Sequence, residues 1–126
     1  MAHDGPVPSV GAHGEDVAAQ ALKRRGYNIL EQNYRCPLGE LDLVASEGKT
    51  LVFVEVKSGQ AQGISPRERV DSRKRRKLIQ VAMFYLKQRK MEGVSARFDV
   101  VEVDFPAHGG SPRVEIIANA FDLDLR

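Results

Sequence analysis

The stretch GELDLVASEGKTLVFVEVK, residues 39–57, decides the fold of this chain. It contains two runs with strand-like composition, Leu41 to Ala45 and Leu51 to Val56, separated by a Ser-Glu-Gly-Lys segment that is typical of a tight turn. In the second run apolar side chains occupy both alternating faces, which is typical of a central strand covered on both sides. We therefore predict a β-hairpin whose second strand lies inside a sheet.

Charged side chains interrupt this apolar hairpin. Glu55 and Lys57 lie two residues apart, so on a strand they project from the same face, and Glu40 and Asp42 share a face of the neighbouring strand by the same period. Burying carboxylates is costly unless they are paired, hydrogen-bonded or bound to a cation. A functional site is therefore the leading explanation of the cluster. Glu40, next to Gly39 at the strand entry, is its weakest member.

The flanking sequence predicts an α/β domain around this hairpin. The periodicity predicts a helix at 10–25 closed by Gly26, a strand at 27–34, a long helix ending near residue 93, and strands at 96–105 and 113–118. This order, α-β-β-β-α-β-β, predicts a mixed five-stranded sheet flanked by helices. We expect residues 1–9 to form a flexible leader, residues 10–126 to form a single domain, and residues 119–126 to form a short helical turn.

Composition limits the setting of the protein. A chain of 126 residues with 42% hydrophobic and 29% charged residues is the size and composition of one soluble globular domain. The single Cys36 excludes an internal disulfide and the usual zinc sites, which fits a reducing, cytoplasmic setting. No apolar run approaches the ~18 residues that span a bilayer. We expect a cytoplasmic protein without a membrane partner.

Charge is unevenly distributed along the chain. Residues 67–77 contain seven basic and two acidic side chains, whereas the last 28 residues, from Asp99, carry a net charge of −4. Such a basic run is equally compatible with a solvated helix face, but its neighbourhood favours phosphate binding. Lys74 heads the apolar stripe of the long helix, so it either extends outward or reaches into a polar site. We predict that nucleic acid is contacted by Lys74, Arg67, Arg69, Arg73, Arg76 and Lys77.

The acidic cluster has the composition of a site for a hard divalent cation. Mg²⁺ (or Mn²⁺) takes oxygen ligands and keeps several waters, so one or two carboxylates and a phosphate oxygen suffice. We predict that Asp42 and Glu55 are ligands, with Glu15 from the first helix as an outer ligand through water. If the site hydrolyses phosphodiester bonds, Lys57 would orient the water molecule that attacks the phosphate or help to deprotonate it. For any single residue an ion pair or a turn cap is the commoner explanation, but not for all of them together.

The order Asp42, then Glu55-x-Lys57, resembles the PD-(D/E)XK motif of the restriction-endonuclease-like nuclease superfamily. A wider set of residues is similar to the YraN family of small bacterial proteins. These residues are Gly14-Glu15, Asn33-Tyr34-Arg35, Gly39-Glu40-Leu41-Asp42-Leu43, Phe53-Val54-Glu55-Val56-Lys57, Val70 with Lys74, Ala82 with Tyr85-Leu86, Arg97-Phe98-Asp99-Val100 and Asn119-Ala120-Phe121.

The resemblance implies a restriction-endonuclease-like core with Glu15, Asp42, Glu55 and Lys57 in the catalytic positions of the superfamily, and with Lys74 as a phosphate contact. One position departs from the pattern. Family members often carry an arginine two residues after the motif lysine, where this chain has Gly59. The corresponding phosphate contact would be missing or would come from Arg67 or Arg69.

Two functions follow as hypotheses. The first is a metal-dependent endonuclease that hydrolyses phosphodiester bonds in DNA, with branched or single-stranded DNA as candidate substrates. The second is a non-catalytic nucleic-acid-binding module that assists DNA repair or recombination. The acids favour the enzyme, because carboxylates beside a phosphate track would weaken a pure binder. A small enzyme acting on two strands would often be a homodimer, although these residues show no interface.

Overall fold

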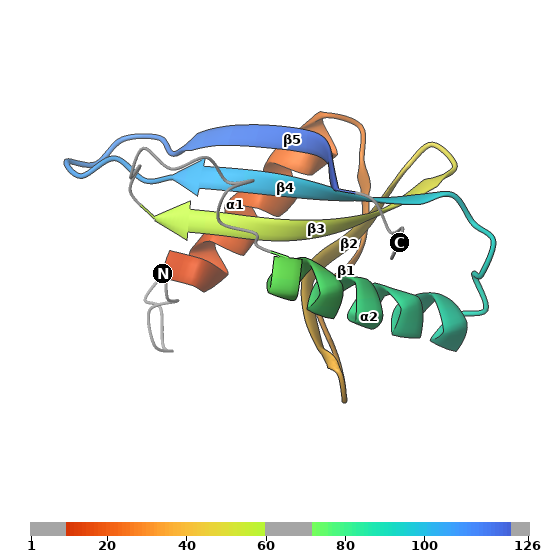
Figure 1. Cartoon of the computed structure of the whole chain (residues 1–126). Helices are drawn as coiled ribbons and strands as arrows, with labels where there is room; N and C mark the ends of the chain where they lie inside the picture. The colour runs from red at the N-terminus through yellow and green to blue at the C-terminus, as the bar shows by residue number, and fades with distance from the viewer. Residues whose placement is uncertain (1–9, 60–71, 122–126) are drawn as a thin grey trace, which may run out of the picture.

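Five strands and two helices make up residues 10–59 and 72–121, the part of the chain that the computed structural model describes (Figure 1). In chain order they are α1 (Val10–Arg24), β1 (Asn28–Cys36), β2 (Gly39–Glu47), β3 (Thr50–Gly59), α2 (Ser72–Gln88), β4 (Ala96–Asp104) and β5 (Arg113–Phe121). The predicted order of elements is confirmed. The expected leader, residues 1–9, and the predicted phosphate contacts Arg67 and Arg69 lie outside the described residues.

The strands form one mixed sheet in the order β1-β2-β3-β4-β5. The pairs β1–β2, β2–β3 and β4–β5 are antiparallel, whereas β3 and β4 are parallel, with Phe53 opposite Phe98. The parallel pair needs a long crossover between its strands, and α2 lies in that crossover. This arrangement is consistent with an α/β restriction-endonuclease-like fold.

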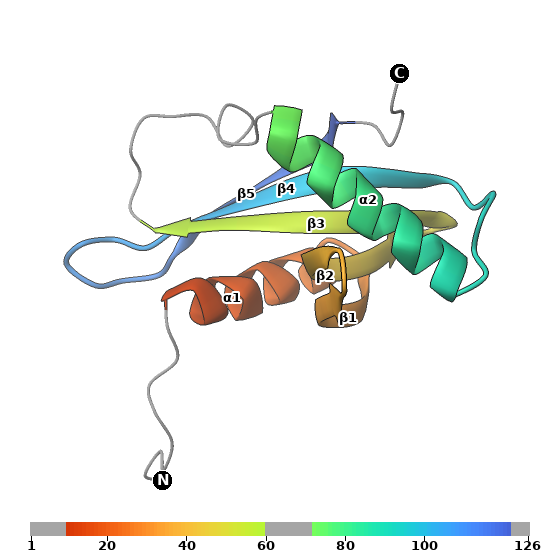
Figure 2. The same cartoon turned by 60° about the horizontal axis from the view of Figure 1, so that its bottom comes forward.

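The two helices cover opposite faces of the sheet, as the rotated view in Figure 2 shows. On one face, Phe53 of β3 packs in a core with Leu78 and Tyr85 of α2. On the other face, Val54 packs in a core with Leu22 of α1. The prediction that β3 is buried on both sides is therefore confirmed, and any polar side chain in this strand must lie near its end or at a site.

Both helices end where a residue in the left-handed conformation reverses the chain. After α1, Gly26 has a φ of 96°, its amide donates to the carbonyl of Lys23 at 3.0 Å, and the amide of Tyr27 donates to Leu22 at 3.0 Å. These two bonds form a Schellman motif. The same pattern follows α2, where Lys90 has a φ of 56° and the amide of Met91 donates to Leu86 at 2.8 Å. This motif ends α2 at Gln88, earlier than we predicted.

The expectation of a helical turn at the end of the chain is wrong for residues 119–121. They belong to β5, where Phe121 lies opposite Phe98 on β4 and stacks on its ring with 4.4 Å between centroids. The backbone amide of Asn119 donates to the carboxylate of Asp99 at 2.8 Å. Contacts with β4 therefore hold these residues extended, and residues 122–126 lie outside the described part of the chain.

Candidate functional site

The site begins where β2 and β3 stop pairing regularly. Their ladder runs from Glu47 opposite Thr50 to Leu43 opposite Val54. Asp42 is the next residue of β2, and its Oδ2 atom accepts a hydrogen bond from the backbone amide of Val56 at 2.8 Å. A side chain thus takes the place of a backbone group in joining the two strands, and this bond fixes the carboxyl group of Asp42 against β3.

The alternation of β2 side chains between the two faces of the sheet is interrupted at the same point. Leu41 and Val44 both pack in the core under α2, although an uninterrupted alternation would put residues three apart on opposite faces. Leu43 packs in the core under α1. The alternation is therefore broken between Leu41 and Leu43, which is where Asp42 lies.

Glu55 and Lys57 project from β3 as the period of a strand requires. The Nζ atom of Lys57 lies 3.3 Å from Oε1 of Glu55, and the two side chains are only 18% and 11% exposed. Residues 51–54 of the same strand are buried and apolar. The pair therefore marks the end of the buried core on the face that α2 covers, and the prediction that the two side chains share a face is confirmed.

A second ammonium group reaches Glu55 from α2. The Nζ atom of Lys74 lies 2.8 Å from Oε1 of Glu55, although the Lys74 side chain is 39% exposed. Leu78, one helical turn later, is buried in the core under α2. Of the two alternatives that the sequence left open, the structure therefore shows that Lys74 reaches into the polar site.

Glu15 approaches the site from the other face of the sheet through a close contact of α1 with β3. A Cβ atom on Gly14 would lie 2.5 Å from Cβ and 2.6 Å from Oγ of Ser58, so only glycine fits here without displacing its neighbour. Glu15 follows, half-buried, and its side chain hydrogen-bonds with those of Asn33 and Asp42. Burial raises its pKa even though these hydrogen bonds oppose the shift.

Negative charge accumulates around Asp42. Burial, and then the neighbouring charge of Glu55, raise the pKa of Asp42 to about 7, against the opposing effect of the Val56 amide. Burial and the adjacent Lys74 lower the pKa of Lys57. Burial alone would also lower the pKa of Lys74, but its hydrogen bond to Glu55 raises it. A bound cation would offset the negative charge that Asp42 and Glu55 bring together here.

Asp42, Glu55 and Lys74 line a pocket of about 310 Å³ between the start of β2, β3 and α2. Its lining residues are Gly39, Glu40, Asp42, Glu55, Lys74, Lys77 and Leu78. Glu40 is exposed and lies 3.4 Å from the guanidinium of Arg35, as expected of a surface charge. Of the predicted nucleic-acid contacts, Lys77 lines the pocket, while Arg73 and Arg76 are exposed on the same helix.

Asp42 and Glu55 together fit a hard divalent cation. Both line the pocket, and carboxylate oxygens are the donors that Mg²⁺ and Mn²⁺ prefer. Within residues 10–59 and 72–121, no group of three or more His, Cys, Asp or Glu side chains is arranged to hold a metal ion. A two-carboxylate site still suffices for Mg²⁺, which keeps several waters and is completed by phosphate oxygens. The third carboxylate, Glu15, stays a prediction as an outer ligand through water.

Sequence reasoning missed the positioning role of Asn33. This residue lies in β1 with a φ of 55°, a left-handed conformation that asparagine tolerates better than most residues. Its side chain hydrogen-bonds with Glu15. Asn33 was part of the Asn33-Tyr34-Arg35 run that carries the family resemblance, but it was given no role there. An asparagine inside a strand-like run is weakly informative without knowledge of its neighbour.

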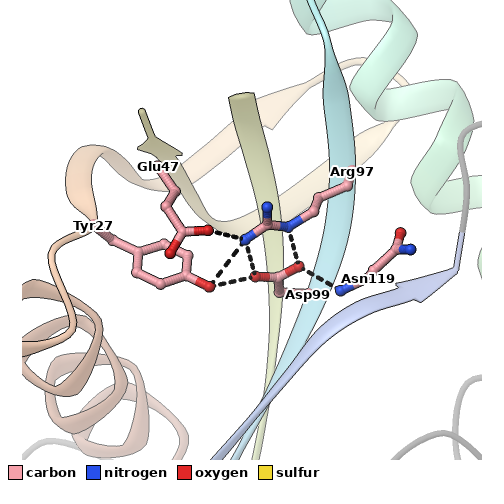
Figure 3. A network of polar contacts seen from close by, with 5 residues as sticks. All are labelled: Tyr27, Glu47, Arg97, Asp99 and Asn119. Atoms are coloured by element: carbon pink, nitrogen blue, oxygen red, sulfur yellow. Dashed lines mark hydrogen bonds and ion pairs between the residues drawn. The ribbon is translucent and has the colours of Figure 1, made fainter. Parts of the chain in front are cut away.

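A second polar network lies on the α1 side of the sheet, shown in Figure 3. Asp99 is fully buried, and its carboxylate accepts hydrogen bonds from the hydroxyl of Tyr27 at 2.9 Å and from Nε of Arg97 at 2.9 Å. Arg97 also contacts the carboxylate of Glu47 at 2.6 Å. The network joins residues from four parts of the chain, so we assign it a structural role: it ties the segment between α1 and β1 and the end of β2 to β4 and β5.

Comparison of the sequence with known proteins identifies the family of this chain. The model of the family described as "Uncharacterised protein family UPF0102" matches residues 14–103. The chain belongs to this family. The YraN resemblance seen in the sequence motifs is thereby confirmed. The matched segment includes every residue of the pocket and also Glu15 and Lys57.

UPF0102 proteins of several bacteria align with nearly the whole chain. The protein of Moorella thermoacetica is 47% identical over 112 residues, covering 88% of this chain and 93% of its own length. The protein of Desulfosudis oleivorans is 44% identical over 116 residues, covering 91% of each chain. Among the helices that the structure describes, none is long and apolar enough to cross a membrane.

Proposed function

We propose that this UPF0102 protein is a metal-dependent nuclease that hydrolyses phosphodiester bonds in DNA. The observation that carries the proposal is the convergence of Asp42, Glu55 and Lys57 where the start of β2 lies beside the end of β3. Two acids from neighbouring strands can hold a metal ion that assists phosphoryl hydrolysis. A lysine two residues after the second acid completes the PD-(D/E)XK pattern that the sequence resembles. The pocket beside them leaves room for a backbone phosphate.

Each group has a definable task in that reaction. Asp42 and Glu55 would hold Mg²⁺ or Mn²⁺, and the bound ion would polarise the phosphate and acidify a water molecule. Lys57 lies 3.3 Å from Glu55 and has a lowered pKa because of burial and the neighbouring Lys74. Its Nζ atom is thus suited to orient the attacking water or to stabilise charge that develops on the phosphate.

The basic residues of α2 supply the surface that would hold the DNA backbone. Lys77 lines the pocket, and Arg73 and Arg76 are exposed on the same helix. Lysine and arginine contacts to phosphates provide affinity that is independent of sequence and falls with salt. This surface favours a substrate recognised by its backbone, and branched or single-stranded DNA are the forms to test first.

A cleavage assay tests the proposal. Linear duplex, single-stranded, flapped and four-way branched DNA are incubated with the protein and Mg²⁺ or Mn²⁺. We expect metal-dependent cutting that Glu55→Gln and Lys57→Met abolish, while Glu92→Gln, which removes an exposed charge beyond α2, leaves cutting intact. Sedimentation of the same samples, with and without DNA, tests whether the active species is a homodimer.

One observation favours the second candidate, a non-catalytic DNA-binding module. Glu55 lies between two ammonium groups, which is also how a purely structural ion-pair cluster would look. If the wild type and the two active-site variants bind DNA equally and show the same faint background of cutting, the binding module becomes the better account. Asp42→Ala would then leave DNA affinity unchanged or increase it without metal.

A further inference from the structure

Lys74 places an ammonium group directly against the carboxylate of Glu55. Its Nζ atom is 2.8 Å from Oε1 of Glu55, closer than the 3.3 Å of Lys57 to the same oxygen. Glu55 and Asp42 line one pocket, and Lys74 lines it with them. An ammonium group and a metal ion at the same carboxylate oxygen would repel each other strongly at such distances.

The two lysines differ in how firmly they are held. Lys57 projects from the central strand β3 and is 18% exposed, whereas Lys74 lies in the first turn of α2 and is 39% exposed. The neighbours of Lys74 on the helix, Arg73 and Arg75, are exposed, and the first fully packed residue of α2 is Leu78. Lys74 is therefore the lysine that can leave Glu55 while the strand stays in place.

We propose that Lys74 is a built-in counter-ion of the acidic pocket, that a divalent cation displaces it from Glu55, and that the displaced ammonium group then binds a phosphate of the nucleic acid. This inference rests on the proposed function, because it concerns the same carboxylates. Lysine is a compact point charge on a flexible stem and binds phosphate well, so the exchange of a carboxylate for a phosphate partner costs little.

Two consequences follow from this exchange. Without nucleic acid, Lys74 competes with the metal and weakens its binding. With nucleic acid present, a phosphate receives Lys74, so metal and nucleic acid assist each other's binding. By reciprocity, the factor by which DNA tightens metal binding equals the factor by which metal tightens DNA binding. The pocket would then acquire its metal mainly when a substrate is present.

The first test measures the affinity of the whole chain for Mn²⁺ in the absence of DNA. The electron paramagnetic resonance signal of the free ion reports how much Mn²⁺ is unbound. Lys74→Met should bind Mn²⁺ about fivefold more tightly than the wild type, the effect expected of removing a partly exposed ion pair. Lys74→Arg, which keeps the charge, should stay near the wild type. Lys77→Met is the matched control: it removes a charge from the same pocket and should change Mn²⁺ affinity less than about twofold.

The second test measures coupling in the Lys57→Met background, where cutting is not expected. The affinity for a labelled single-stranded oligonucleotide is measured by fluorescence anisotropy with and without Mn²⁺. We expect Mn²⁺ to tighten DNA binding when Lys74 is present and to do so much less in Lys57→Met/Lys74→Met. A melting curve for each variant confirms that it is folded.

The outcomes separate the two proposals. Equal Mn²⁺ affinity in the wild type and Lys74→Met, with cutting intact in the wild type, would overturn the counter-ion role and leave the nuclease standing. If neither the wild type nor any variant binds Mn²⁺, both the counter-ion role and the metal-dependent nuclease are overturned, because the metal site itself is absent. If Lys74→Met and Lys77→Met both bind Mn²⁺ more tightly by the same factor, the loss of any positive charge from the pocket explains the effect. That result would overturn the specific role of Lys74.

Discussion

The carboxyl group of Asp42 accepts a hydrogen bond from the backbone amide of Val56 at 2.8 Å and so joins β2 to β3 beyond the last regular pair of their ladder. This single contact places a half-buried acid next to Glu55. It also explains how the sheet tolerates an acid at this point, since the amide of Val56 is satisfied by the side chain. The energetic consequences of that placement can be measured.

Asp42→Asn should stabilise the metal-free protein at about pH 8, by roughly 4 kcal/mol at most. At about pH 4 the substitution should have little effect on stability. Burial and Glu55 raise the pKa of Asp42 to about 7 from its ordinary value of 3.8. Between these two values the folded protein binds more protons than the unfolded chain, so the wild type loses stability as pH rises through this window. An asparagine keeps an acceptor for the Val56 amide and carries no charge.

Urea unfolding of the wild type and Asp42→Asn at several pH values checks this prediction. Mn²⁺ provides the control, because it should stabilise the wild type at about pH 8 but not Asp42→Asn, which lacks one of the two proposed ligands. A variant that is less stable than the wild type at every pH would contradict the raised pKa of Asp42.

Gly14→Ala should destabilise the protein by about 1–3 kcal/mol, because the new Cβ would meet Ser58 at 2.5 Å. The sign of this stability change is informative, because glycine to alanine at an unconstrained helix position stabilises a protein by roughly 0.5–1 kcal/mol. Thermal melting measures it, and Gly14→Ala/Ser58→Gly is the matched rescue because it removes the atoms that the new Cβ would meet. Stabilisation by Gly14→Ala alone would show that α1 does not approach β3 as closely as described.

The network around Asp99 should govern stability and not metal binding. Tyr27→Phe removes one of the hydrogen bonds to a fully buried carboxylate and should cost about 1–2 kcal/mol. Asp99→Asn disrupts the ion pair with Arg97 and should cost about 3 kcal/mol. Urea unfolding measures both. Mn²⁺ affinity should match the wild type in each variant, and a clear loss of affinity would connect this network to the pocket.

Arg73→Gln/Arg76→Gln should weaken binding to all DNA sequences alike and should lower the slope of log affinity against log salt by about 1–2. Both arginines are exposed on the half of α2 that lies next to the pocket. Lys87→Gln removes an exposed charge in the last turn of the same helix and serves as the control. If the control lowers the slope as much as the double variant, the DNA does not follow the start of α2.

The central strand and the positions of the motif residues could be predicted from the sequence because they depend on local patterns. Apolar residues on both faces of residues 51–56 indicated double burial, and the two-residue spacing of Glu55 and Lys57 put them on one face. The end of the chain could not be predicted in this way. Residues 119–121 are held extended by Phe98 and Asp99, which are about twenty positions away in the sequence.

The sequence by itself determined the order of the elements, the mixed sheet and the family, because alternation, helical spacing and motif residues are properties of short segments. Only the tertiary structure decided how the site is assembled: that Asp42 bonds to Val56, that Gly14 brings Glu15 close, and that Lys74 reaches Glu55. These contacts join residues 14 to 44 positions apart in the sequence. Their geometry depends on how α1 and α2 pack on opposite faces of the sheet, and no local pattern encodes that packing.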